Sequence, residues 1–350
     1  MDIARWRLVN HRLVGSDLKT PAGVVAHMGG IQAQDYDGGI WSIGLRLPGS
    51  TEADVHTAIA ARTVIRTWAM RGTLHFIEAG SIRWILELLA NGIIARASLR
   101  HRQLGLDSVT FRRSEDVLTK ALEGGKQMTR EELVGVLESR GIRCDGQRAV
   151  YILHWASVNR VICFGVKRGK QFTHVLFEEW VGKTRPQSSD QALGELTCRF
   201  FTSHAPATVQ DFMWWSGLSA ADAAKGIEIS KKRLEKQEHH GRTYWAGVER
   251  RPAGTTVESI QLLPGFDDYL LGYKNRGASL DPKHAHRLGS GGVLRPSIIM
   301  NGEVIGTWRR TKRQNRPTVM TETFVALGKK GRSLLDAAVN AYNRFIGPDQ

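Results

Sequence analysis

The order of helices followed by a β-hairpin recurs along the chain and limits its fold more than any other feature. In the first copy, three helix-like segments precede strand-like runs at 63–70 and 73–79, joined by an Arg71-Gly72 turn. Further strand pairs surround the basic turn at 167–170 and the His240-Gly241 turn. Helices followed by a β-ribbon are typical of winged-helix modules. We therefore predict three such modules in tandem, at a spacing of roughly 70–100 residues.

From about residue 257 the pattern changes to short strand-like runs separated by Gly, Pro and Asn. Asn301-Gly302 predicts a hairpin turn, and residues 332–346 predict a closing helix. The predicted class is therefore α+β, with three winged helices and a C-terminal β-rich, barrel-like domain. The predicted domains are 1–105 (winged helix 1 and a linker helix), 106–185 (winged helix 2), 186–255 (winged helix 3) and 256–350 (the β-domain).

Helix-start signals fix the position of several of these elements. Thr20 followed by Pro21 is an N-cap with Pro at the first helical position, and it predicts a helix over residues 21–35. Thr129 with Glu132 three residues later predicts a capping box before the next helix.

Charge and cysteine content restrict the function classes. The chain has 49 Lys and Arg against 34 Asp and Glu, a formal charge of +15, which favours a polyanionic partner, with nucleic acid first. An enzyme that is merely basic explains the charge equally well. Three scattered cysteines without a Cys-x-x-Cys pair predict neither a disulfide framework nor a zinc site. We expect an intracellular, cytoplasmic protein without a membrane span or a secretory signal.

Two basic stretches in the C-terminal domain are candidate DNA contacts. Residues 309–316 lie between strand-like runs, which predicts a basic hairpin for phosphates or a groove; the alternative is a solvated loop. Residues 283–287 sit in a predicted loop, with a plain surface loop as the alternative. The side chains proposed to bind DNA are His284, His286, Arg287, Arg309, Arg310, Lys312, Arg313 and Arg316.

A Gln-x-Gln motif, Gln32-Ala33-Gln34, stands between a Gly pair and Asp35. By itself this motif is weak, because two exposed amides near a helix end explain it. Together with W-x-M-RGTLHF at 68–76, LLPGFDDYLLGYKNR at 262–276 and LRPSIIMNGEVIGTWRR at 294–310, however, the chain resembles the AlkZ/YcaQ-type winged-helix DNA glycosylases. The four strings occur in family order, and the Gln-x-Gln form is closer to the AlkZ-like branch.

This resemblance implies tandem winged helices and a β-domain arranged as a C-shaped clamp on duplex DNA. It also implies that Gln32 and Gln34 are catalytic, and similarity to self-resistance enzymes of antibiotic producers that unhook bulky guanine adducts. Asp35 then either supports the pair or is only a helix-end residue. Arg71 and His75 either line the same site or serve the turn and the packing of the hairpin.

Two amides suit a leaving group that needs no acid. Gln can hold a water with its carbonyl and its amide, but it is not a strong base. A guanine alkylated at N7 is cationic and departs neutral. We therefore expect a monofunctional glycosylase, acting as a monomer on duplex DNA that carries N7- or N3-alkylated purines or crosslinks, without lyase activity, metal or cofactor. The alternatives are a non-enzymatic DNA-binding regulator and, less favoured, a small-molecule enzyme or drug-sequestering protein.

Overall fold

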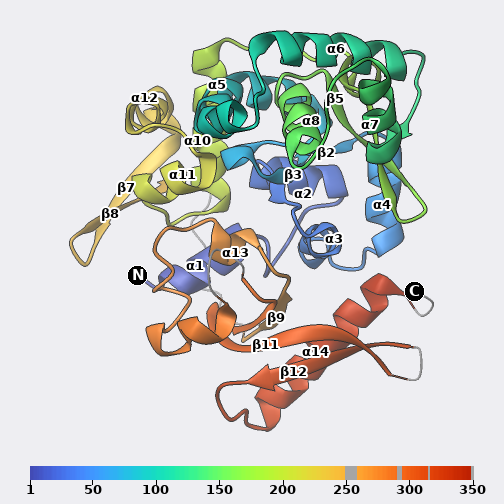
Figure 1. The fold of residues 1–350 in the computed structure, drawn as a ribbon. Helices are drawn as coiled ribbons and strands as arrows, with labels where there is room; N and C mark the ends of the chain where they lie inside the picture. Colours follow the sequence, from blue (N-terminus) through green and yellow to red (C-terminus); the bar gives the residue numbers. More distant parts are fainter. Residues whose placement is uncertain (249–257, 290–293, 314–315, 348–350) are drawn as a thin grey trace. The chain divides into compact units, whose positions relative to one another are not determined.

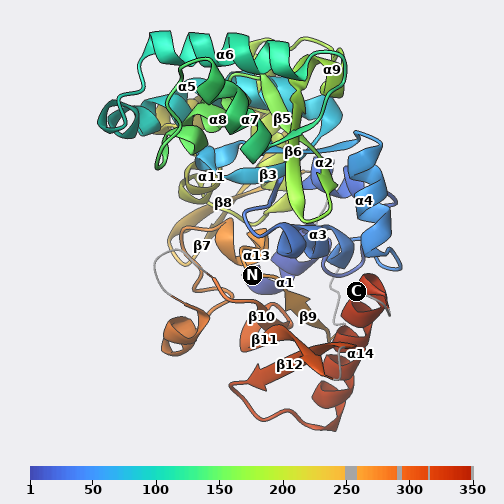
Figure 2. The same ribbon diagram turned by 45° about the vertical axis from the view of Figure 1, so that its right-hand side comes forward.

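The structure is a computed structural model that describes residues 1–248, 258–289, 294–313 and 316–347. For residues 312–313 and 316–317 it describes the backbone only. The described chain divides into two compact units, Thr57–Leu193 and Met1–His56 with Gly194–Gln350. Each unit is described by itself below, and the elements are drawn in Figures 1 and 2.

The Thr57–Leu193 unit is built around helices with two small antiparallel sheets. Strands β2 and β3 pair from Val64↔Glu78 to Trp68↔Leu74, and β4, β6 and β5 form a second sheet. Its elements are β2 (Val64–Trp68), η1 (Met70–Gly72), β3 (Leu74–Glu78), α5 (Ala79–Gln103), α6 (Ser108–Leu122), β4 (Met128–Thr129), α7 (Arg130–Ser139), α8 (Arg148–Val158), β5 (Ile162–Arg168), β6 (Gln171–Leu176) and α9 (Phe177–Val181). The helix α4 (Glu52–Ala60) leads into this unit.

Apolar side chains at helical spacing form the core of this unit. Leu118, Leu122, Leu133, Leu137 and Ile152 are fully buried in one cluster. The predicted capping box is confirmed, because Thr129 accepts from the backbone of Glu132 while Glu132 accepts from that of Thr129.

The second unit joins both ends of the chain. Its helices and strands are α1 (Ile3–Asn10), α2 (Pro21–Met28), β1 (Ile31–Gln32), α3 (Tyr36–Leu45), α10 (Ser189–Ser203, which begins before residue 194), α11 (Val209–Ser216), α12 (Ala220–Ser230), η2 (Lys231–Arg233), β7 (Leu234–His239), β8 (Arg242–Gly247), β9 (Ile260–Leu263), α13 (Asp268–Leu271), η3 (Pro282–Leu288), β10 (Ser297–Met300), β11 (Glu303–Arg313), β12 (Arg316–Thr323) and α14 (Lys329–Ile346). The hairpin β7–β8 turns at His240-Gly241, as predicted.

The predicted barrel is wrong. Strands β12, β11, β10 and β9 form an antiparallel sheet in that order. Among the described residues, the edge strands β9 and β12 do not pair with each other, so the sheet is open. Helix α14 lies along this sheet (Figures 1 and 2), with the ring of Tyr342 at 4.8 Å from that of Trp308 on β11 and 5.0 Å from that of Trp41 on α3. The helix thus covers apolar surface that a barrel would enclose by closure.

A buried ion pair connects the two halves of this second unit. Arg46, at the end of α3, donates to both carboxylate oxygens of Asp267 at 2.8 and 2.9 Å, and both side chains are fully buried. The Ser42 hydroxyl donates to the same carboxylate at 2.7 Å. This bidentate geometry satisfies the charges in a place without water, which a buried ion pair requires.

Replacing Asp267 with Asn leaves the Arg46 charge buried without a counter-ion. We expect Asp267→Asn to lower the free energy of unfolding by about 3–5 kcal/mol in urea titrations followed by circular dichroism. The matched control, Asp336→Asn, changes an exposed carboxylate on α14 and is expected to leave that free energy unchanged within about 0.5 kcal/mol. Equal stability of the two variants would contradict this role of the pair.

The difference should also depend on pH. Burial opposes ionisation of Asp267, but the charge of Arg46 and the hydrogen bonds outweigh it and lower the pKa of this carboxyl. The ionised form therefore contributes stability above its unfolded pKa of about 3.9, and that stability is lost as the pH falls through the lower folded value. We expect a constant difference between wild type and variant from about pH 5 to 8, shrinking only below about pH 4.

Candidate active site and nucleic-acid interface

The Gln-x-Gln motif lies outside the helix in which the sequence placed it. Helix α2 starts at Pro21 with the Thr20 cap as predicted, but it ends at Met28, and the expected helix to residue 35 is wrong. Gly29 and Gly30 have φ values of +77° and +150°, which only glycine adopts readily, so the chain leaves the helix and enters the short strand β1.

The two glutamines of the motif have different surroundings. Gln32 is buried, and its Oε1 accepts a hydrogen bond from the backbone N–H of Gln34 at 2.8 Å. Gln34 is exposed to solvent. The carbonyl of Gln32 therefore holds the local backbone, while the amide of Gln34 is presented at the surface, where one side chain offers both a donor and an acceptor.

Asp35 is the N-cap of α3. Its side chain accepts from the backbone N–H of Gly38 at 3.2 Å, and a Cβ at Gly38 would lie 2.6 Å from the same carboxylate. Asp35 is therefore not the last residue of the predicted helix but the cap of the next one, and its carboxylate helps to fix where α3 starts. A catalytic part for Asp35 stays a prediction.

Arg71 and His75 belong to the Thr57–Leu193 unit. Arg71 takes the left-handed conformation (φ 58°) in the turn between β2 and β3, as the turn signal predicts. His75 is completely buried, and its Nδ1 lies 2.9 Å from the carbonyl oxygen of Thr73. Burial and, to a smaller extent, the charge of Arg71 lower the pKa of His75 to about 3, whereas this hydrogen bond acts in the opposite direction. The ring is therefore neutral at physiological pH. This geometry favours a role for His75 in the packing of the hairpin.

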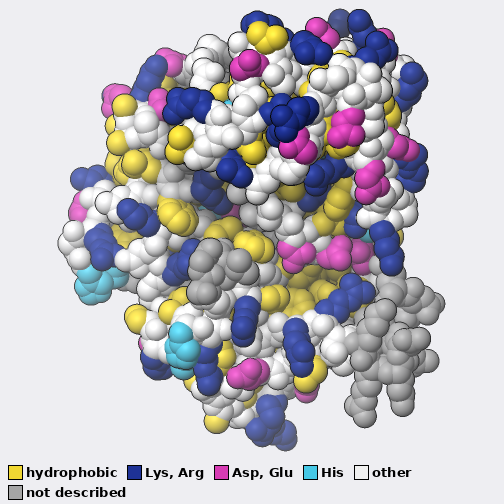
Figure 3. Space-filling view, in the orientation of Figure 1, with side chains coloured by type: hydrophobic (Ala, Val, Ile, Leu, Met, Phe, Trp, Pro, Cys, Tyr) yellow, Lys and Arg dark blue, Asp and Glu magenta, His cyan; other side chains and the backbone are white. Residues whose placement is uncertain are grey.

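The predicted basic hairpin is confirmed as a hairpin. Strands β11 and β12 pair through Arg313↔Arg316, and Arg309 and Arg310 are exposed on β11. Residues 314–315 and the side chains of Lys312, Arg313 and Arg316 lie outside the described residues. On the face drawn in Figure 3, Lys and Arg side chains are spread widely over the surface, in keeping with the charge of +15.

The second basic stretch is a 3₁₀ helix, η3, and not the predicted loop. Asp281 caps it and Pro282 occupies its first turn, a pair of signals that also starts helices elsewhere in the chain. The ring of His284 lies 4.8 Å from that of Phe324, and the guanidinium of Arg287 lies 4.6 Å from the same ring. His286 is exposed.

Sequence reasoning missed an electrostatic cluster beside the motif. Buried Tyr342 on α14 has its pKa raised by burial and by the charges of Glu52, Asp37 and Asp35, against the charge of Arg310. Arg310 of the basic hairpin and the carboxylates of Asp35 and Asp37 therefore act on the same side chain. No sequence signal links residues so far apart along the chain.

No group of three His, Cys, Asp or Glu side chains in the described part of the chain is arranged to hold a metal ion. Within the same part of the chain, no helix combines the length and the apolar character needed to cross a bilayer.

The second unit thus holds a buried amide, Gln32, an exposed amide, Gln34, and a two-stranded ribbon with exposed arginines. The family model of DNA glycosylase AlkZ-like proteins matches residues 25–345, and the chain belongs to this family of DNA glycosylases. An interstrand DNA cross-link repair glycosylase of Streptomyces sahachiroi is 27% identical over 326 residues, covering 87% of this chain and 85% of the relative. The predicted resemblance and enzyme class are thereby confirmed, and the regulator and small-molecule alternatives are set aside.

The solved structure of Streptomyces sahachiroi DNA glycosylase AlkZ has the same fold. It matches with a TM-score of 0.84 at 22% identity, covering 100% of this chain and 98% of the other.

If the β11–β12 hairpin binds DNA phosphates, removing its charges should weaken binding in a salt-dependent way. We expect the triple variant Arg309→Gln, Arg310→Gln, Arg313→Gln to bind duplex DNA more weakly, with a slope of log Kd against log salt reduced by about 2–3. Fluorescence anisotropy of a labelled duplex at several salt concentrations measures this slope. A control triple of exposed residues, Lys120→Gln, Lys126→Gln and Arg140→Gln, removes the same charge and is expected to change the slope less. Equal slopes for both triples would reject the hairpin as the contact.

Proposed function

We propose that this protein is a monofunctional DNA glycosylase that hydrolyses the N-glycosidic bond of cationic, N7- or N3-alkylated purines in duplex DNA. Its substrates include bulky guanine adducts and interstrand crosslinks, the lesion named for the Streptomyces sahachiroi relative. The observation that carries the proposal is the different setting of the two glutamines: Gln32 accepts a hydrogen bond from the backbone, whereas Gln34 is exposed.

The chemistry follows from the charge of the leaving group. A purine alkylated at N7 or N3 carries a positive charge, so breaking its bond to C1′ releases a neutral base and needs no general acid. The sugar is left as an oxocarbenium-like cation, and water adds to it at C1′ and loses a proton to solvent. The Gln34 amide holds this water by accepting one hydrogen bond, and its carbonyl dipole faces the developing cation.

The remaining features fit the same proposal. The buried carbonyl of Gln32 fixes the backbone of Gln34, so this residue acts through position, and the cap at Asp35 fixes the start of α3 next to it. The β11–β12 hairpin and η3 supply cationic side chains for phosphates. Three winged helices that clamp duplex DNA as a monomer, with the predicted domain limits, belong to this proposal.

The deciding experiment is single-turnover excision from a duplex with one N7-methylguanine, with abasic sites revealed by alkali. We expect Gln34→Ala to slow excision by about 10²–10³-fold and Gln32→Ala to slow it to an equal or smaller extent, with DNA binding retained in both. Gln237→Ala, a partly exposed glutamine on β7 outside the motif, is the matched control and should leave the rate unchanged.

A crosslinked duplex serves as the second substrate in the same assay. Excision of either lesion by Gln34→Ala at the wild-type rate would show that Gln34 does not hold the water. Wild-type inactivity on both lesions would contradict the proposed substrate class.

Excision should also be nearly independent of pH. The amides of Gln32 and Gln34 do not titrate, and His75, with its pKa of about 3, stays neutral. We expect the single-turnover rate on N7-methylguanine to vary by less than about twofold from pH 6 to 8. A bell-shaped profile in this range would require a titrating acid or base and would contradict water positioning by amides alone.

A further inference from the structure

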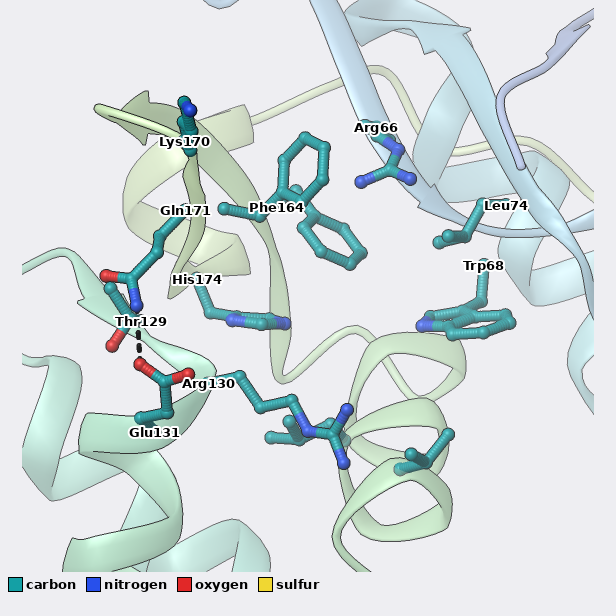
Figure 4. A pocket seen from close by; sticks show the side chains of 13 residues that line it. Arg66, Trp68, Leu74, Thr129, Arg130, Glu131, Phe164, Lys170, Gln171 and His174 are labelled. Atoms are coloured by element: carbon teal, nitrogen blue, oxygen red, sulfur yellow. Dashed lines mark hydrogen bonds between the residues drawn. The ribbon is translucent and has the colours of Figure 1, made fainter. Parts of the chain in front are cut away.

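The Thr57–Leu193 unit contains a cavity of about 320 Å³ that the Gln-x-Gln chemistry does not use. Strands β2, β3, β5 and β6 and the starts of α7 and α8 form its walls, and Figure 4 shows side chains from several of these elements converging on one space. Its volume is at the lower end of the range for ligand pockets, which begins at about 300 Å³. Space of this size suits one ring system and not a large molecule.

Aromatic rings form much of the lining. Phe164 on β5 and Phe172 on β6 lie edge to face with ring centres 6.0 Å apart, and Trp68 from β2 lines the same space (Figure 4). Buried Arg66 places its guanidinium 4.7 and 4.2 Å from the centres of the two phenyl rings, which holds both rings in place. A planar ring that enters this space can stack without rearranging the wall.

One polar group faces this lining from within. His174 on β6 is 4% exposed and points into the cavity in Figure 4, and its Nδ1 has no hydrogen-bond partner among the described residues. Burial and, to a smaller extent, the charges of Arg66 and Arg130 lower the pKa of His174 to about 4. A hydrogen bond to the backbone of Met128 raises this pKa but does not outweigh burial. The ring is therefore neutral at pH 7 and lines the cavity as an uncharged aromatic surface.

The charge at the mouth is positive. Arg130 and Lys170 are exposed and line the opening, and the amide of Gln171 holds the carboxylate of Glu131. With Arg66 the lining has three cations and one anion. An aromatic interior with cations at its mouth matches a group that is a planar base at one end and an anion at the other.

We propose that this cavity binds a single unstacked nucleotide, with its base among the aromatic side chains and the ring of His174, and its phosphate at Arg130. The ligand comes either from solution as a mononucleotide or from a DNA strand that has lost base pairing at that position. The inference does not depend on the water-holding role of Gln34.

The test uses 2-aminopurine riboside 5′-monophosphate, whose fluorescence falls when its base stacks. We expect saturable quenching with wild type, weaker binding of the nucleoside without phosphate, and no competition from ribose 5-phosphate. Phe172→Leu should weaken nucleotide and nucleoside alike, by about tenfold or more. Arg130→Gln should weaken only the nucleotide, by about three- to tenfold. Lys120→Gln, an exposed lysine on α6, should bind like wild type.

A second arm identifies the source of the nucleotide. A duplex with 2-aminopurine opposite an abasic site is compared with a fully paired duplex. Quenching that occurs only in the first duplex, and that Phe172→Leu removes, assigns the cavity to DNA; a response of the mononucleotide alone assigns it to free nucleotide. If Phe172→Leu and Arg130→Gln, both folded by circular dichroism, match wild type in both arms, or if wild type quenches the probe in neither arm, the proposal is overturned.

Discussion

The ion pair between Arg46 and Asp267 is the interaction on which the unit that carries the Gln-x-Gln motif depends. It joins the end of α3 to a residue 221 positions later, in the DDYLLGY string by which the sequence resembles its family. Other residues of this string have the same structural character. The Tyr269 hydroxyl lies 2.9 Å from the carbonyl oxygens of Ala4 and Gly302, and Tyr273 donates to the carbonyl of His204. The string therefore marks a buried polar junction that holds distant segments together.

The junction has a consequence for the glutamine pair. Helix α3 begins directly after Asp35, which caps it, and ends at Arg46, which the junction holds. Gln34 thus directly precedes the cap of a helix whose other end is fixed by a bidentate ion pair. On the other side, the turn at Gly29 packs against Trp215, whose ring would lie 3.2 Å from a Cβ at this position. The backbone that carries Gln34 is therefore fixed on both sides, as the proposed positioning of a water would require.

Local signals were the part of this structure that the sequence predicts well. The Thr20-Pro21 cap, the Thr129–Glu132 capping box and the Arg71-Gly72 turn depend on neighbouring residues only, and all three are confirmed. The helix expected to reach Asp35 failed because two glycines with positive φ end it early, although the Gly pair itself was visible. The open sheet under α14 and the nucleotide-sized cavity depend on contacts between distant segments, for which a single sequence has no signal.

The surroundings of Gln34 also explain how neutral amides could serve a reaction that develops positive charge. Amide dipoles alone stabilise a sugar cation less than a carboxylate does. Asp35, Asp37 and Glu52 act electrostatically on Tyr342, opposed by Arg310, and Asp35 and Asp37 lie within three residues of Gln34 in the sequence. The carboxylate of Asp35 accepts the capping hydrogen bond of α3, and its negative charge still acts on the surrounding groups. In the proposed mechanism, negative charge near the glutamines would favour both a cationic purine and an oxocarbenium ion, and exposed arginines such as Arg310 would offset its repulsion of phosphates.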